Sequence, residues 1–177
     1  MAKRSDFARR PQDKYYTPYE AVLPLLPHLA PNTRFTEPCA GDGRLIDHLE
    51  KHGHGCVDAF DVQPEREDIA KADALEVVID SPAIGKNEIV ITNPPWTRQI
   101  LHPLIEHWRT QMPTWLLFDA DWVHTKQSAP FMPYCRKIVS VGRVRWIEGT
   151  KMTGKDNVAW HLFAHEAGPT EFYGRTP

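Results

Sequence analysis

The stretch Phe35-Thr36-Glu37-Pro38-Cys39-Ala40-Gly41-Asp42-Gly43-Arg44-Leu45 joins a short strand pattern to a glycine turn and then to a helix pattern. Gly41 and Gly43 allow a tight turn and a close approach of the backbone to a ligand. Asp42, between them, suits turn geometry and can cap the helix that begins near Arg44. The apolar residues that follow lie on one helix face, which indicates a strand, a turn and a helix of an α/β protein.

Strand and helix patterns alternate along the chain as far as the strand predicted at 114–119. Strands are predicted near residues 34–37, 56–60, 76–79, 88–92 and 114–119. Helices are predicted near 18–29, 44–52, 65–71 and 97–110, the first of them short or kinked by Pro24 and Pro27. Thr17 is predicted to be the N-cap of the first helix, with Pro18 at the first helical position. This alternation predicts a parallel sheet with helices on both faces.

The last third of the sequence lacks helix patterns. Strands are predicted at 137–141, 143–147 and 158–164, with a polar loop at 148–157 between the last two. We therefore expect an antiparallel hairpin at the end of a mostly parallel sheet.

A rigid turn follows the apolar run that ends at Thr92. It consists of Asn93-Pro94-Pro95-Trp96, in which two prolines fix φ and remove two backbone donors. The Asn93 amide oxygen and a free backbone carbonyl can accept the two hydrogens of an exocyclic amino group. The adjacent Trp96 offers a flat face on which a ring can stack. The turn therefore suits chemistry on a planar amine.

The Asn-Pro-Pro-Trp turn resembles the catalytic motif of S-adenosylmethionine-dependent methyltransferases that act on adenine N6 or cytosine N4. Residues 37–43 resemble the Asp/Glu-x-x-x-Gly-x-Gly motif of the same enzymes, whereas Ile46 breaks the dinucleotide fingerprint. The motif order resembles the gamma group of DNA adenine methyltransferases. The resemblance implies a class I methyltransferase, Rossmann-like fold with a mostly parallel seven-stranded sheet. It also implies a small type, as in phage and prophage enzymes, without a separate target-recognition domain.

The resemblance implies a site for S-adenosylmethionine. Asp61, at the end of a second strand, is expected to accept hydrogen bonds from the ribose, and Asp73 from the adenine amino group. A helix cap or a solvated loop acid remains an alternative for Asp61, and a solvated loop residue for Asp73. The predicted cofactor residues are Tyr16, Thr17, Pro18, Glu37, Pro38, Cys39, Ala40, Gly41, Gly43, Asp61, Val62, Asp73, Ala74 and Asn93.

The predicted catalytic residues are Asn93, Pro94, Pro95 and Trp96. Asn93 and the Pro94 carbonyl would hold the amine, and Trp96 would stack on the target ring. In the turn after the fifth strand, Trp122 is expected in the core, with packing over a flipped base as the alternative.

Charge is unevenly distributed along the chain. The net charge is −2, but residues 36–88 carry 13 acids against 5 bases, and residues 126–155 carry 7 bases against Glu148 alone. A cationic cofactor fits the acidic part and a phosphate backbone fits the basic part. The predicted nucleic-acid contacts are Lys126, Arg143, Arg145, Lys151 and Lys155.

Length and composition limit the remaining possibilities. The 177 residues suit one domain at 14–165, with a basic tail at 1–13 and a short tail at 166–177. Cys39, Cys56 and Cys135 lack paired metal spacing and fit a reduced cytoplasm. We expect no membrane segment, no metal, and a monomer or homodimer.

The predicted activity is transfer of a methyl group to adenine N6 in DNA, with low or short-context sequence specificity. RNA adenine methylation, methylation of protein glutamine at N5, and a non-enzymatic binding module remain alternatives.

Overall fold

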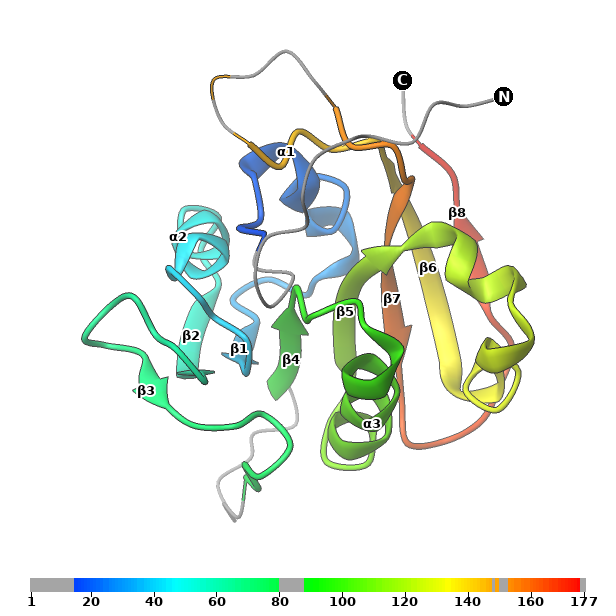
Figure 1. Cartoon of the computed structure of the whole chain (residues 1–177), viewed down its shortest axis with the longest axis horizontal. Helices are drawn as coiled ribbons and strands as arrows, with labels where there is room; N and C mark the ends of the chain where they lie inside the picture. The colour runs from blue at the N-terminus through cyan, green and yellow to red at the C-terminus, as the bar shows by residue number, and fades with distance from the viewer. Residues whose placement is uncertain (1–14, 80–87, 148, 150–152, 176–177) are drawn as a thin grey trace.

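The structure is a computed structural model that describes residues 15–79, 88–147, 149 and 153–175. Its centre is a sheet of eight strands in the order β3-β2-β1-β4-β5-β7-β6-β8 (Figure 1). The strands are β1 (Arg34–Glu37), β2 (Gly55–Asp61), β3 (Ala70–Lys71), β4 (Glu88–Thr92), β5 (Thr114–Asp119), β6 (Cys135–Gly142), β7 (Val158–Phe163) and β8 (Glu171–Tyr173). The first five are parallel, and β7 is antiparallel to both β5 and β6. The predicted mostly parallel sheet with an antiparallel C-terminal part is therefore confirmed.

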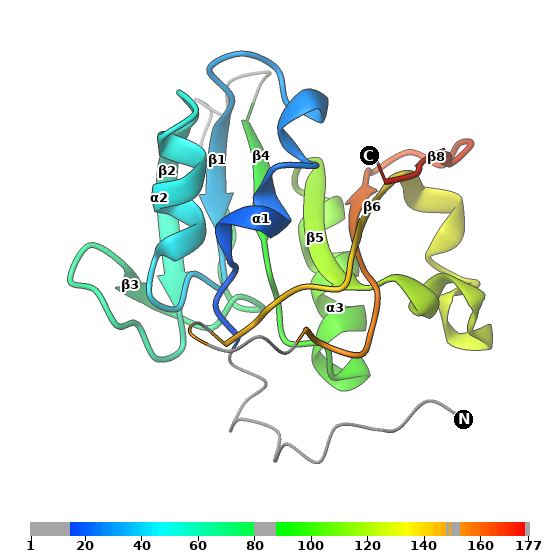
Figure 2. The same ribbon diagram turned by 90° about the horizontal axis from the view of Figure 1, so that it is seen from above.

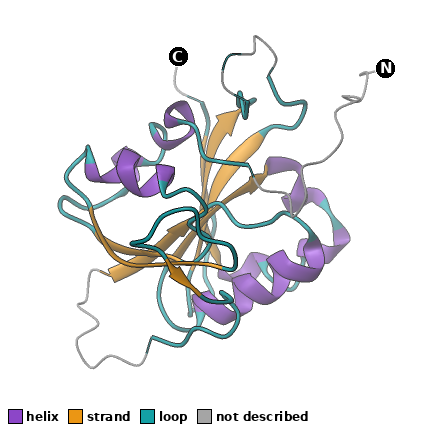
Figure 3. Ribbon diagram, turned by 60° about the vertical axis from the view of Figure 1, so that its left-hand side comes forward, coloured by secondary structure: helices purple, strands orange, loops and turns teal. Residues whose placement is uncertain are grey.

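Helices cover both faces of the sheet, as Figure 2 shows. Helices α1 (Tyr19–Val22) and α2 (Arg44–Glu50) lie on one face with the short helix η2 (Leu26–His28), and α3 (Arg98–Arg109) lies on the other. Buried side chains of α1 and α2 form one core with Phe35, and α3 packs on two further clusters. The short helices η3 (Ala120–His124), η4 (Lys126–Ser128) and η5 (Met132–Tyr134) connect β5 to β6. Figure 3 shows helices on either side of the central sheet.

Two predicted elements near β3 are wrong. No helix forms at 65–71, where the loop bonds instead to the glycine turn and to α2. The amide of Glu65 donates to the carbonyl of Gly41 at 3.1 Å, and Arg66 binds Asp47. No strand forms at 76–79, where the backbone bonds to side chains of His107, in α3, and of Gln111, just after it, instead of a neighbouring strand. Ile79 N donates to Gln111 Oε1 at 2.9 Å.

The predicted strand at 143–147 is also absent from the structure. Gly142, with φ +85°, ends β6, and the amide of Arg145 donates to Glu20 Oε1 at 3.0 Å. The antiparallel pair is therefore β6 with β7. The eighth strand, β8, lies in the segment predicted as a C-terminal tail and pairs with β6 in parallel.

The first helix is split, as its prolines predicted, but the predicted Thr17 cap is wrong. Pro18 is the N-cap residue of α1, and no side chain caps that end. Asp42 does bond at the start of α2, where its Oδ1 accepts from the amide of Arg44 at 3.0 Å.

Candidate active site

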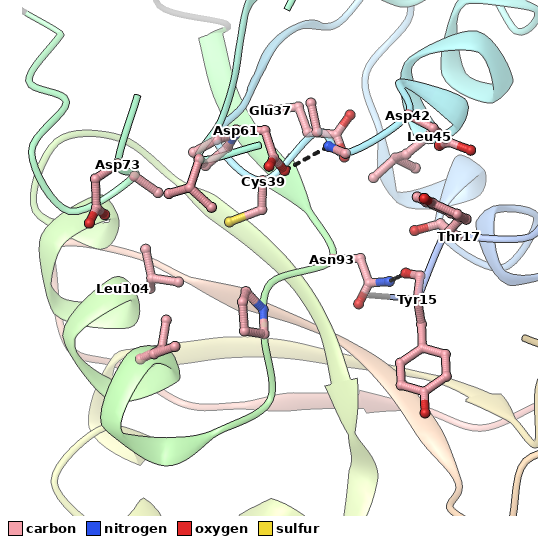
Figure 4. Close-up of a pocket in the computed structure, with 18 of the residues that line it drawn as sticks. Tyr15, Thr17, Glu37, Cys39, Asp42, Leu45, Asp61, Asp73, Asn93 and Leu104 are labelled. Atoms are coloured by element: carbon pink, nitrogen blue, oxygen red, sulfur yellow. Dashed lines mark hydrogen bonds between the residues drawn. The ribbon is translucent and has the colours of Figure 1, made fainter. Parts of the chain in front are cut away.

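A cavity of about 480 Å³ lies at the carboxyl ends of β1, β2 and β4 (Figure 4). Its walls come from the glycine turn after β1, the end of β2, residues 73–75, the turn after β4, the first half of α3 and residues 15–17. The carboxyl edge of parallel strands is where open α/β sheets bind ligands. The cavity therefore brings together all the predicted cofactor residues except Pro18 and Gly43.

The glycine turn is held by Asp61. Gly41 and Gly43 have φ of 56° and 75°, in the left-handed region that favours glycine. The amide of Gly41 donates to Asp61 Oδ2 at 2.8 Å, and the amide of Gln63 donates to Oδ1 at 2.7 Å. Each carboxylate oxygen keeps a free lone pair, so Asp61 can hold the turn and still accept from a ligand hydroxyl.

Gly43 acts behind the cavity and not in its wall. A Cβ at this position would clash with a guanidinium nitrogen of Arg66, which bonds to the Gly43 carbonyl and to Asp47. Gly43 therefore leaves room for an arginine that ties the 63–69 loop to α2.

Glu37 is the buried acid of the cavity. Its side chain is 2% exposed, and Oε2 has no hydrogen-bond partner among the described residues. Burial, followed by the charges of Asp42 and Asp61, holds the pKa of Glu37 well above its ordinary value. An unpartnered buried carboxyl oxygen is costly unless a ligand completes it, so this wall fits a cationic group.

Cys39 lies between the two ends of the cavity, and its sulfur is visible in Figure 4. Burial and the nearby acids raise the pKa of its thiol. The Cys39 thiol is therefore neutral, and it forms part of the cavity wall and is not a nucleophile.

At the far end of the cavity from Tyr15, Asp73 is exposed and accepts a hydrogen bond from the amide of Leu75 at 2.9 Å. Ala74 and Leu75 provide apolar surface next to it. An acceptor beside apolar side chains can bind a flat ring that carries an amino group.

Asn93 is fixed by two neighbours. Its Nδ2 donates to the carbonyl of Tyr15 at 2.9 Å, and its Oδ1 accepts from Trp96 Nε1 at 3.3 Å. Only the amide nitrogen can donate to the Tyr15 carbonyl, so the first bond determines which side-chain atom is Nδ2 and which is Oδ1. Oδ1 is therefore an acceptor with one lone pair remaining. Asn93 therefore presents a fixed acceptor in the same cavity as Glu37 and Asp61.

The other residues of the proline turn differ in position. Pro95 lines the cavity, whereas Pro94 is buried. Trp96 is half-buried against two core clusters, and its Nε1 also donates to the carbonyl of Leu117 at 3.2 Å. The indole N–H thus orients Asn93. Stacking of Trp96 on a target ring stays a prediction.

Two aromatic residues beside Asn93 were missed by the sequence analysis. Trp146 meets Trp96 edge-on at 5.6 Å between ring centroids, and Tyr15 lies 6.1 Å from Trp146. A Cβ on Gly154 would come within 3.1 Å of the Trp146 ring, so the loop before β7 packs closely on it. The strand predicted at 143–147 does not form, and the sequence pattern therefore gives no indication that Trp146 lies next to Trp96.

Residues 15–17 form a strap over the cavity. Tyr16 donates its hydroxyl to Glu65 Oε1 at 2.5 Å, and the Arg44 guanidinium lies 5.2 Å from the Tyr16 ring centroid. Since Tyr15 binds Asn93, the strap connects the loop after β2 to the turn after β4.

Sequence comparison finds no matching family model and no matching curated protein. Solved structures do match. A Pyrococcus horikoshii protein, provisionally described as an RNA methyltransferase, is 18% identical with a TM-score of 0.60, covering 94% of this chain and 95% of that one. A Listeria monocytogenes protein, provisionally described as a class I S-adenosylmethionine-dependent methyltransferase, is 11% identical with a TM-score of 0.54, covering 89% and 63%. The chain has the class I methyltransferase fold.

A larger protein shares the methyltransferase fold. The methyltransferase subunit of a type I restriction-modification system from Streptococcus thermophilus is 9% identical with a TM-score of 0.54. The match covers 92% of this chain, which spans about half of that subunit, 48%.

The predicted nucleic-acid contacts lie mainly at one edge of the sheet. Arg143 and Arg145 are exposed beyond the carboxyl end of β6, and Lys126 is exposed on η4. The Nζ atom of Lys155 is shielded from solvent and has no hydrogen-bond partner in the described part of the chain. Lys151 lies outside the described residues.

Trp122 is buried and donates to His102 Nε2 at 3.0 Å, which confirms its predicted place in the core. Within the described ranges, no helix is long and apolar enough to cross a membrane. The same residues contain no cluster of three or more histidine, cysteine or acidic side chains that could hold a metal ion.

Proposed function

We propose that this protein transfers a methyl group from S-adenosylmethionine to the N6 amino group of adenine in DNA. The observation that carries the proposal is a fixed acceptor, Asn93 Oδ1, in the same cavity as the buried Glu37 carboxyl and the glycine turn. An amide acceptor at the end of a cofactor-sized cavity suits a planar amine substrate.

The cavity residues fit S-adenosylmethionine along its whole length. Glu37, with its unpartnered oxygen, faces the cationic methionine part, Asp61 accepts from the ribose, and Asp73 accepts from the adenine amino group. The strap at 15–17 closes over the methionine end. When bound, the cofactor supplies an electrophilic methyl group on a sulfonium.

The protein's own part in the reaction is orientation. Asn93 Oδ1 and the carbonyl of Pro94 accept the two amine hydrogens, which turns the nitrogen lone pair out of conjugation with the ring. Trp96 and Tyr15 hold the Asn93 amide in place, so little reorganisation is needed as charge develops on the nitrogen. The amine loses its proton to water after transfer, and no side-chain base is required.

Duplex DNA would have to extrude the target adenine, at a cost of a few kcal/mol. A single strand avoids most of this cost. We therefore propose that unpaired or weakly paired adenines are preferred.

The test is incubation with methyl-labelled S-adenosylmethionine and separate samples of single-stranded DNA, duplex DNA, RNA and protein. Mass spectrometry of the digested products identifies the methylated group. N6-methyldeoxyadenosine from the wild type, and none from Asn93→Ala, supports the proposal. Label only in N6-methyladenosine or in glutamine would assign the same site to RNA or protein instead.

A further inference from the structure

A second groove, of about 430 Å³, lies on the α3 face of the sheet between η3 and β8. Its floor is made by Ile138 and Ser140 of β6 and Ala159 of β7. Asp121 and His124 of η3 form one wall, and Phe172 and Arg175 form the other. The groove therefore depends on β8, the strand absent from the predicted seven-stranded sheet (Figure 1).

The groove and the candidate active site share one edge of the sheet. β5 and β6 are both antiparallel to β7, and β8 is parallel to β6, so β5, β6 and β8 point the same way as β4. Arg175, which follows β8, is therefore at the same edge as Asn93, which follows β4. The amide of Ala120 donates to the carbonyl of Asn157 at 2.8 Å, which fixes the end of the groove nearest that edge.

Phe172 and Arg175, which form the wall on the β8 side of the groove, are exposed and do not belong to the core. Phe172 is 69% exposed, the highest value among the large apolar side chains that the structure describes. The neighbouring Tyr173 is different, because its hydroxyl bonds to Glu171 at 2.6 Å and its ring meets His28 at 4.4 Å. Phe172 thus keeps an open aromatic face over the groove.

Arg175 provides an unpaired cation. The exposed side chain of Arg175 lies over Gly142. A Cβ added to Gly142 would come within 2.9 Å of the Cδ atom of Arg175. No ion pair or hydrogen bond joins its guanidinium to any of the described residues. An aromatic face beside a free guanidinium suits a base next to a phosphate.

We propose that this groove binds a nucleotide that flanks the target in a single strand, with its base on Phe172 and its phosphate at Arg175. The proposal rests on the proposed function. A single strand is favoured because a base can stack on a side chain only when it leaves its own stack. Ser140 and Asn157 add polar groups within the groove.

The test compares fluorescent oligodeoxynucleotides in which one adenine lies among thymines. A three-nucleotide probe fills only the active site, and nine-nucleotide probes extend it in the 5′ or the 3′ direction. Binding is measured by anisotropy with S-adenosylhomocysteine present, and methyl transfer is measured on the same probes. We expect one direction of extension to tighten binding by the wild type.

Phe172→Ala should weaken binding of that longer probe by about 5- to 150-fold and leave the short probe unchanged. Arg175→Ala should make the slope of log K against log salt less negative by about 0.7. The matched controls are Val78→Ala, a side chain 68% exposed elsewhere, and Arg34→Ala, at the opposite edge of the sheet. Both controls should bind like the wild type.

Two outcomes overturn the inference. If the wild type methylates the probes but both groove variants bind long and short probes as it does, the groove has no such role and the proposed function stands. If the variants lose affinity for both probes equally, they act on the fold or the active site. A wild type that neither binds nor methylates any probe removes the proposed function itself.

Discussion

Replacement of the buried His161 should make the fold less sensitive to acid. His161 is fully buried on β7 and stacks on Phe118 with 3.9 Å between ring centroids. Neither ring nitrogen forms a hydrogen bond of good geometry to a described residue, and burial lowers the pKa of His161 to about 3. Between this pKa and the unfolded value of about 6.5, the unfolded chain binds a proton that the folded chain excludes.

The sign and size of the effect follow from the two pKa values. Stability contributed by neutral His161 is fully present above pH 6.5 and decreases as the pH falls, by about 1.4 kcal/mol per pH unit. At pH 5 the loss is about 2 kcal/mol. His161→Phe should remove this loss, whatever its own packing cost, because the packing cost does not change with pH.

The assay is urea unfolding of the wild type and His161→Phe at pH 7.5 and pH 5. The wild type should lose about 2 kcal/mol more unfolding free energy between these pH values than the variant does. The other histidines contribute to both proteins and cancel. The control is replacement of the exposed His165 by Asn. This variant should lose as much unfolding free energy between pH 7.5 and pH 5 as the wild type does. Equal losses in wild type and His161→Phe would refute the assignment of a neutral buried imidazole.

Trp96→Phe keeps an aromatic ring but removes the N–H that orients Asn93, so it should lower kcat more than it changes cofactor affinity; an unchanged kcat would contradict a positioning role. Glu37 should lose its proton when a cationic cofactor binds, so affinity should fall as the pH is lowered, and calorimetry in buffers of different ionisation enthalpy should detect the released proton. Methylated adenines on a long DNA should occur in many contexts, because the described residues around the cavity offer mainly loops to read base edges; confinement to one motif of about five or more base pairs would contradict this, since each good base pair contact contributes about 1–3 kcal/mol.

The sequence predicted the parallel half of the sheet because its strands are short apolar runs bounded by clear turn residues. β1, β4 and β5 match the predicted bounds, and α2 and α3 begin close to their expected starts. The failures have a common cause. At 65–71, 76–79 and 143–147 the backbone conformation is decided by partners far along the chain, such as Gln111 for Ile79 and Glu20 for Arg145. Such partners leave no local pattern.

The candidate site was predictable where short motifs specify the backbone. The glycine turn, Asp61 and Asn93 do enclose one cavity. The neighbours of Asn93 were not predictable, because Tyr15 lies 78 residues from it in sequence and Trp146 sits in an irregular loop. The groove beside Phe172 was missed for a similar reason, since a three-residue strand has too little pattern to be recognised.

Calorimetric titration of S-adenosylmethionine into the wild type and Asp61→Ala tests the central claim most directly. The wild type should bind one equivalent. Asp61→Ala should bind at least about tenfold more weakly, because a hydrogen bond to a charged group contributes about 1.5–3 kcal/mol and Asp61 holds the glycine turn. Asp58→Ala, an exposed acid on the same strand, should match the wild type. Absence of binding by the wild type, or equal affinity of Asp61→Ala, would contradict the assignment of this cavity to the cofactor.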